Sequence, residues 1–180
     1  MVVPPVEVPT ETPMQQEVMV VEVSRPVKHE VNMAEVPKYL AMTIVLDSGA
    51  GAHVMNSKEA PGYKVQPSEM HKMGATLKAA NGSAIKHQGQ VSLNIVAKDS
   101  KGEKHKITSK FEAAEVTKAL WSVGLICDCG LDANFNAKRA VVYDKTGKEV
   151  CVFPRERNGL YMAEVEIPNP VHPDFHGQGA

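Results

Sequence analysis

The sequence predicts a mainly β protein. Short apolar or β-branched runs such as Thr43–Leu46 have the length and composition of buried strands. In Gln90–Ala97 the apolar residues alternate with polar ones, which is typical of a half-buried strand. Turn signals separate the runs, and the clearest is the Asn-Gly pair at positions 81 and 82, which favours a β-hairpin. Helix-compatible sequence is scarce by comparison.

The other expected elements follow from the same two signals, a β-type run and a turn on each side of it. The further expected strands are Ala75–Ala80, Ser83–Lys86, Lys104–Phe111, Ala119–Trp121, Ala140–Tyr143, Glu149–Phe153 and Gly159–Ile167. Residues 57–73 are expected to form a polar loop with a weak strand. One short helix is expected over Val123–Cys129, with Ser122 as its N-cap and Gly130 at its end.

The chain divides by composition. Residues 1–40 contain six of the twelve prolines and no glycine, and they are rich in valine and glutamate. Because proline fixes φ and lacks an amide donor, this segment is predicted to be a flexible linker. The folded core is expected over 41–136, a β-hairpin extension over 137–167, and a flexible tail over 168–180. An alternative is that 130–167 forms a small separate unit.

Bulk properties restrict the class of partner. The net charge of −1 gives no global argument for nucleic-acid binding. Residues 58–110 carry ten lysines and four acidic residues, which indicates a solvated basic face or, alternatively, attraction to RNA or acidic peptide segments. The lack of interleaved aromatic residues argues against a nucleic-acid surface. No apolar run approaches the roughly 18 residues that span a bilayer, so no membrane partner is expected.

Cysteine and histidine patterns predict neither a disulfide framework nor a metal site. The three cysteines favour a reducing, intracellular compartment. Cys127 and Cys129 are separated by one residue, which suits burial better than zinc binding. His172 and His176 lie four apart with a proline between them, in the predicted tail. No cofactor or metal is expected.

The stretch TIVLDSGAGAH, residues 43–53, raises the main functional question. Asp-Ser-Gly is by itself a common turn, but here Asp47 directly follows a buried strand. Aspartic peptidases hold a carboxylate in such a loop, and two carboxylates sharing a proton are needed to activate water. The sequence contains no second Asp-Ser-Gly or Asp-Thr-Gly. A catalytic Asp47 therefore predicts a C2 homodimer with the site on its axis.

Three segments together resemble the protease region of copia-type LTR retrotransposons. They are LDSGAGAHV, AANGSAIKHQGQVSL, and LWSVGLICDCGLDANFNAKRAVVYDKTGKEV followed by RERNGLYMAEV. The resemblance covers about residues 40–165. It implies a mainly β, retropepsin-like closed or barrel-like lobe with one short helix, working as a C2 homodimer. Gly51 departs from the family pattern, which usually has Ser or Thr there. Ser122 matches the copia branch, where retroviral relatives have Gly.

The resemblance also implies roles for individual residues. It assigns catalysis to Asp47, loop support to Ser48, Gly49 and Ala50, a substrate-binding flap to Ala80, Asn81, Gly82 and Ser83, and a place under the active site to Leu120, Trp121 and Ser122. His53 is interpreted as a packing or hydrogen-bonding residue, with modulation of the catalytic pair as the alternative.

The function implied is an aspartic endopeptidase that cleaves extended segments of the Gag-Pol polyprotein. The implied location is the cytoplasm, including virus-like particles. The alternative is a catalytically inactive, retropepsin-like module for dimerisation or peptide binding.

Overall fold

The structure, a computed structural model, describes residues 35–175, and the prediction of a mainly β protein is confirmed. The longer strands are β1 (Tyr39–Asp47), β5 (His87–Lys98), β6 (Lys104–Ala114), β9 (Arg139–Tyr143), β10 (Glu149–Pro154) and β11 (Met162–Pro168). The shorter ones are β2 (Val54–Met55), β3 (Leu77–Lys78), β4 (Ala84–Ile85), β7 (Ala119–Ser122) and β8 (Asp132–Phe135). Two short α-helices, α1 (Glu69–Lys72) and α2 (Val123–Asp128), and a 3₁₀ turn, Ser57–Glu59, complete the described elements.

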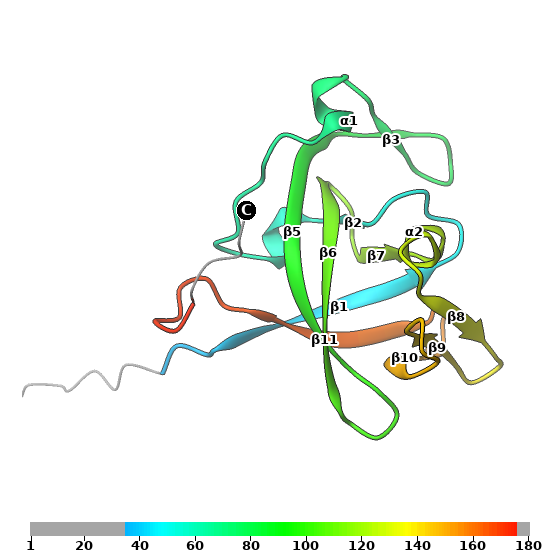
Figure 1. The fold of residues 1–180 in the computed structure, drawn as a ribbon. Coiled ribbons are helices and arrows are strands. Elements are labelled where there is room, and N and C mark those ends of the chain that lie inside the picture. Colours follow the sequence, from blue (N-terminus) through cyan, green and yellow to red (C-terminus); the bar gives the residue numbers. More distant parts are fainter. Residues whose placement is uncertain (1–34, 176–180) are drawn as a thin grey trace, which may run out of the picture. The chain divides into compact units, whose positions relative to one another are not determined.

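Six strands pair in the cyclic order β1-β11-β5-β6-β2-β7 (Figure 1). At two junctions in this ring the neighbouring strands share a single residue pair. Strands β11 and β5 are joined by the pair Glu166–Val96, and strands β2 and β7 by the pair Val54–Leu120. The strands therefore do not form a continuous closed barrel, which corrects the expectation of a closed lobe. The short β2 has too few residues to extend its junction with β7.

The C-terminal strand belongs to the same ring as β1. The two strands pair antiparallel over seven residue pairs, from Tyr39 with Pro168 to Val45 with Met162. Beyond β11 the chain remains attached, since the Asn169 N–H donates to the Lys38 carbonyl at 2.9 Å. The expected flexible tail therefore does not begin at residue 168. The expected linker lies outside the described residues except for 35–40, and so does the end of the tail, 176–180.

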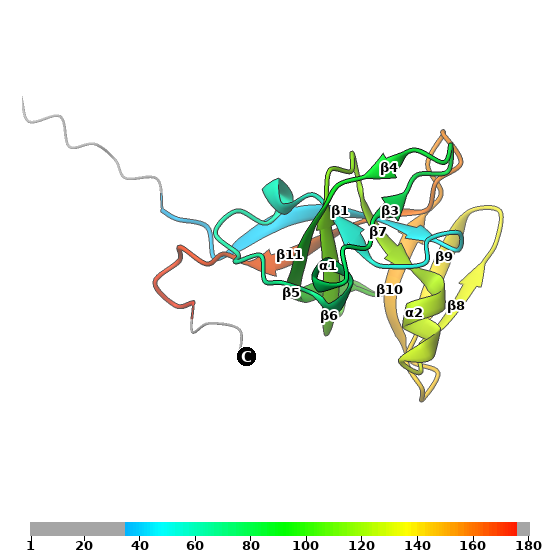
Figure 2. The ribbon, with the colours of Figure 1, turned by 90° about the horizontal axis from the view of Figure 1, so that it is seen from above.

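Outside the ring, β3 pairs with β4, and strands β8, β9 and β10 form a three-stranded sheet beside α2 (Figures 1 and 2). Phe153 of β10 is fully buried, and its ring lies 6.0 Å from that of Trp121 on β7, so this three-stranded sheet shares the core of the ring. Residues 130–167 are accordingly not a separate unit. Sequence reasoning missed β8, because Asp132–Phe135 has no clear apolar alternation.

The two helices begin at serine caps. Ser122 accepts a hydrogen bond at its Oγ from the Leu125 N–H at 3.3 Å, so the expected helix and its cap are confirmed. Helix α1 was not expected in the polar loop; it begins where the Ser68 Oγ accepts from the His71 N–H at 3.1 Å. Among residues 35–175, neither helix has the length or apolarity needed to cross a membrane.

The three cysteines have different environments. Cys151 on β10 is buried, and burial raises the pKa of its thiol to about 12, so it remains an unreactive core thiol at neutral pH. Cys127 and Cys129 are exposed, which corrects the expectation that they are buried. The reason is the orientation of α2, whose buried residue is Ile126.

Gly89 is a position where a side chain is excluded. Its φ is +132°, and an added Cβ would lie 2.3 Å from the carbonyl oxygen of Gln66, which pairs with Gln90 of β5. We expect Gly89→Ala to destabilise the fold by about 1–3 kcal/mol from backbone strain alone. Urea unfolding would measure the loss.

Gly51 provides the matched control for Gly89→Ala, because nothing lies within 4 Å of its added Cβ and its φ is not positive. Gly51→Ala should change the free energy of unfolding by about 0.4–1 kcal/mol, in the stabilising direction. Equal effects of the two substitutions would contradict the steric explanation.

Candidate active site

Asp47 ends β1 in a loop whose backbone holds the carboxylate. The Gly49 N–H donates to the Asp47 Oδ1 at 2.8 Å. A Cβ at position 49 would lie 3.4 Å from the same oxygen, at the edge of ordinary contact. Ser48 and Gly49 are exposed and Asp47 is half-buried, so the carboxylate is both oriented and accessible. The loop that the sequence predicted around Asp47 is therefore present.

Ser122 joins the loop to the neighbouring strand and helix. Strands β1 and β7 are parallel, and the register places Asp47 beside Ser122. The Ser122 Oγ–H donates to the Ala50 carbonyl at 2.6 Å, while its N–H donates to the His53 Nδ1 at 2.9 Å. Since the same hydroxyl caps α2, one side chain holds the loop, β7 and the helix together.

His53 is a buried, neutral acceptor beneath the loop. It is 7% exposed, and its ring lies 5.5 Å from that of Phe111. Burial lowers the pKa of His53 from 6.5 to about 4. Because Nδ1 accepts from the Ser122 N–H, the neutral ring carries its proton on Nε2. The packing and hydrogen-bonding interpretation of His53 matches this geometry.

A pocket of about 260 Å³ adjoins Asp47. Strand β1, the segment leading into β7, and the turn between β10 and β11 contribute its walls. Its lining residues are Val45, Leu46, Asp47, Val116, Thr117, Lys118, Leu120, Gly159, Leu160 and Tyr161. Sequence reasoning identified only Asp47 and Leu120 among them. The Asn-Gly-Leu-Tyr segment carries no local signal that it lies beside the Asp47 loop.

Leu120 and Trp121 lie on opposite faces of β7, as successive strand residues do. Leu120 lines the pocket beside Asp47. Trp121 faces the core, where its Nε1–H donates to the Ser109 Oγ at 3.1 Å. Of this pair, only Leu120 is therefore in a position to contact a molecule bound at Asp47.

The segment for which the resemblance implies a flap forms a small exposed hairpin of β3 and β4. At its tip, the Asn81 Oδ1 accepts from the Ser83 N–H at 3.0 Å and from the Ser83 Oγ at 2.7 Å. Only Gly82 has a positive φ, of +81°, so the turn differs from the two-residue Asn-Gly turn in which both residues have positive φ. Ala80, Asn81, Gly82 and Ser83 thus form one compact, solvent-exposed tip.

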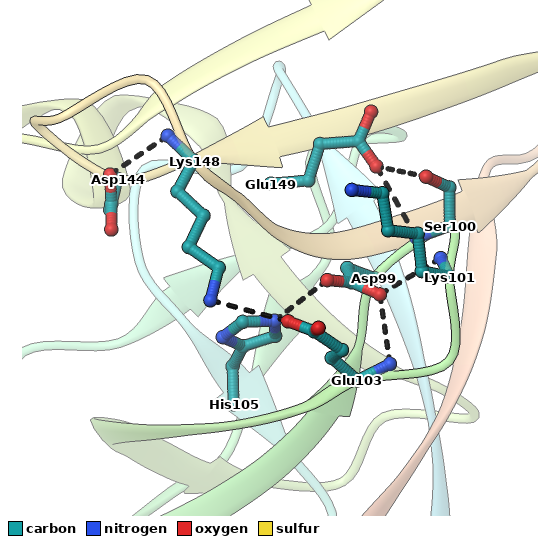
Figure 3. A network of polar contacts seen from close by, with 8 residues as sticks. All are labelled: Asp99, Ser100, Lys101, Glu103, His105, Asp144, Lys148 and Glu149. Carbon is teal, nitrogen blue, oxygen red and sulfur yellow. Dashed lines mark hydrogen bonds and ion pairs between the residues drawn. The ribbon is translucent and has the colours of Figure 1, made fainter.

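A second polar cluster lies at the hairpin between β5 and β6 (Figure 3). Asp99, Glu103 and His105 bring ligand-type atoms within 4.8 Å of one another, an arrangement that a cation could use. The Asp99 Oδ1 accepts from the Lys101 and Glu103 N–H groups, both at 2.9 Å, and its Oδ2 lies 3.0 Å from the His105 Nε2. The hydrogen bond from His105 lowers the pKa of Asp99.

The same cluster connects two hairpins. Lys148, in the turn before β10, lies 3.3 Å from Glu103, and the Ser100 Oγ–H donates to Glu149 of β10 (Figure 3). The carboxylate and imidazole groups that a cation would need are therefore already engaged in hydrogen bonds and ion pairs within the chain. We interpret the cluster as a structural connection between the two hairpins.

Comparisons of the chain with protein-family models, with curated proteins and with solved structures found no match. The functional interpretation consequently depends on the geometry around Asp47.

Proposed function

We propose that the protein is an aspartic endopeptidase of the retropepsin type, whose active site forms when two copies of the chain bring their Asp47 residues together. The observation that carries this proposal is the Asp47 loop. An accessible carboxylate ends a buried strand, a backbone N–H orients it at 2.8 Å, and a mainly apolar pocket adjoins it. The resemblance to copia-type proteases points the same way, and it makes the Gag-Pol polyprotein the proposed substrate.

The mechanism needs two carboxyl groups and one water. Two carboxylates at hydrogen-bonding distance repel each other, so the pair retains one proton. The ionised Asp47 takes a proton from the water while the water oxygen bonds to the peptide carbonyl carbon. The protonated Asp47 of the other copy donates its proton to the carbonyl oxygen, which gives a neutral tetrahedral diol. Collapse of the diol breaks the C–N bond, and a proton passes to the amine leaving group.

The loop contacts have a defined role in this mechanism. The Gly49 N–H fixes one carboxylate oxygen, and the bond from Ser122 to the Ala50 carbonyl holds the loop against β7. Fixed carboxylates lose less entropy when water and substrate bind. The exposed β3–β4 hairpin supplies a flap that would cover an extended peptide and exclude bulk water.

Self-processing tests the proposal. The full chain and its Asp47→Asn variant are expressed in parallel and analysed by mass spectrometry after incubation from pH 4 to pH 8. Asp128→Asn, at the exposed end of α2, serves as the matched control. We expect N-terminal trimming in the wild type and the control, and none in Asp47→Asn. Trimming that persists in Asp47→Asn, or a stable dimer that cuts no peptide library, would overturn the proposal.

Gly51 favours one second candidate, a non-catalytic module that binds peptides. Position 51 lacks the Ser or Thr hydroxyl that the copia-type pattern usually has there, and no atom lies within 4 Å of a Cβ placed at Gly51. Such a module should bind peptides equally well with Asp47→Asn, and fluorescence anisotropy with a labelled peptide library would show it.

A further inference from the structure

We propose that the turn between β10 and β11, residues 156–160, is part of the substrate-binding site: with Lys118 it forms the outer wall of the pocket beside Asp47 and selects the substrate side chain bound there. This inference rests on the proposed function. It assigns a role in substrate specificity to a segment that lies in the predicted extension, 137–167, outside the predicted core, 41–136.

The turn is attached to the strand that carries the catalytic residue. The Leu46 N–H, one residue before Asp47, donates to the Tyr161 carbonyl at 2.9 Å. The turn itself is closed by two backbone bonds, from the Glu156 N–H to the Leu160 carbonyl at 2.8 Å and from the Gly159 N–H to the Glu156 carbonyl at 2.9 Å. The position of the turn relative to Asp47 is therefore set by hydrogen bonds.

The Tyr161 side chain anchors the same turn from the other side. Its hydroxyl donates to the Asn136 carbonyl at 2.9 Å, and the Phe135 ring meets it edge-on with centroids 5.0 Å apart. The Arg155 guanidinium lies over the ring, 5.8 Å from its centroid. A wall held by a hydrogen bond and two ring contacts can discriminate between side chains, because distorting it would break these contacts.

The pocket has the chemistry of a site for one apolar side chain. At about 260 Å³ it is smaller than the roughly 300 Å³ at which pockets for whole small molecules begin. Val45, Leu120 and Leu160 supply apolar surface, and Leu160 is 38% exposed at the wall. Lys118 is the cation that lines the pocket. We therefore assign it a leucine- or methionine-sized side chain next to the cleaved bond, with basic side chains disfavoured by Lys118.

The test compares cleavage profiles of a peptide library for the wild type, Leu160→Ala and Lys118→Glu. Val171→Ala serves as the control, since Val171 is 70% exposed and is not among the pocket residues. Leu160→Ala should shift the preference from leucine toward phenylalanine and tryptophan by about tenfold in relative kcat/KM. Lys118→Glu should raise cleavage of peptides with lysine or arginine at that position. Val171→Ala should retain the wild-type profile.

The outcomes separate this inference from the proposed function. If Leu160→Ala and Lys118→Glu are active and keep the wild-type cleavage profile, the specificity role of the turn is wrong, while the proposed protease function still stands. A wild-type dimer that cleaves nothing would overturn both. Circular dichroism of each variant establishes that it is folded, and Leu160→Met, which conserves apolar volume, should keep the preference for leucine.

Discussion

Mixing wild-type chains with an equal amount of Asp47→Asn chains is expected to leave about a quarter of the wild-type peptidase activity. Random pairing puts two intact chains in only about one dimer in four, and a dimer with one carboxylate cannot both deprotonate water and protonate the carbonyl oxygen. The measurement is the initial rate of peptide cleavage after the two chains are unfolded together and refolded at a fixed total concentration.

Measuring the activity at several ratios of wild-type to Asp47→Asn chains is more informative than measuring it at one ratio. A site shared by two chains predicts activity that falls with the square of the wild-type fraction, whereas a site contained in one chain predicts a linear fall to about one half at equal mixing. Mixtures with Asp128→Asn, at the exposed end of α2, should keep full activity. A linear dependence in a verified mixed dimer would contradict the two-carboxylate mechanism.

Lowering the pH from 6.5 to 4 is expected to destabilise the protein through His53. The folded state holds the pKa of His53 at about 4, below the 6.5 of the unfolded chain, so the unfolded state binds the extra proton first. The contribution of neutral His53 to the free energy of unfolding is fully present above pH 6.5 and is lost progressively as the pH falls toward 4. It amounts to about 3 kcal/mol at most. Protonation would also remove the acceptor that Nδ1 offers to the Ser122 N–H.

His53→Asn is the variant that isolates this effect. Its amide oxygen can replace Nδ1 as the acceptor for the Ser122 N–H, but it does not titrate. Urea unfolding from pH 4 to pH 7.5 should show a flatter stability profile for His53→Asn than for the wild type. A wild-type slope that persists in His53→Asn would show that another group carries the acid sensitivity. In that case protonation of His53 would not determine the lowest pH at which the proposed protease stays folded and active.

The local features of the fold could be predicted from the sequence. Alternation along Gln90–Ala97 and the apolar run Thr43–Leu46 indicate strands because burial on a pleated sheet imposes a period of two. Helix α2 follows from Ser122 and Gly130, since capping depends on neighbours within a few residues. The Asp47 loop is equally local, because the Gly49 N–H that holds the carboxylate is two residues away.

Elements with weak local signals were missed or misplaced. Asp132–Phe135 becomes β8 because β9 offers it a hydrogen-bonding partner, although its own sequence does not alternate. Helix α1 occupies a polar segment in which none of its residues is buried, so no apolar periodicity could reveal it. The exposure of Cys127 and Cys129 likewise depends on which face of α2 meets the core.

The sequence by itself determined that this is a mainly β protein with a carboxylate in an Asp-Ser-Gly loop after a buried strand. Only the tertiary structure decided what surrounds that carboxylate. Ser122 forms hydrogen bonds with Ala50, which is 72 positions away in the sequence, and with His53, which is 69 positions away. The Leu46 N–H donates to the carbonyl of Tyr161, which is also distant in the sequence. Local patterns report burial and turn preferences, whereas contacts between distant segments depend on how the strands pack, which no short stretch of sequence encodes.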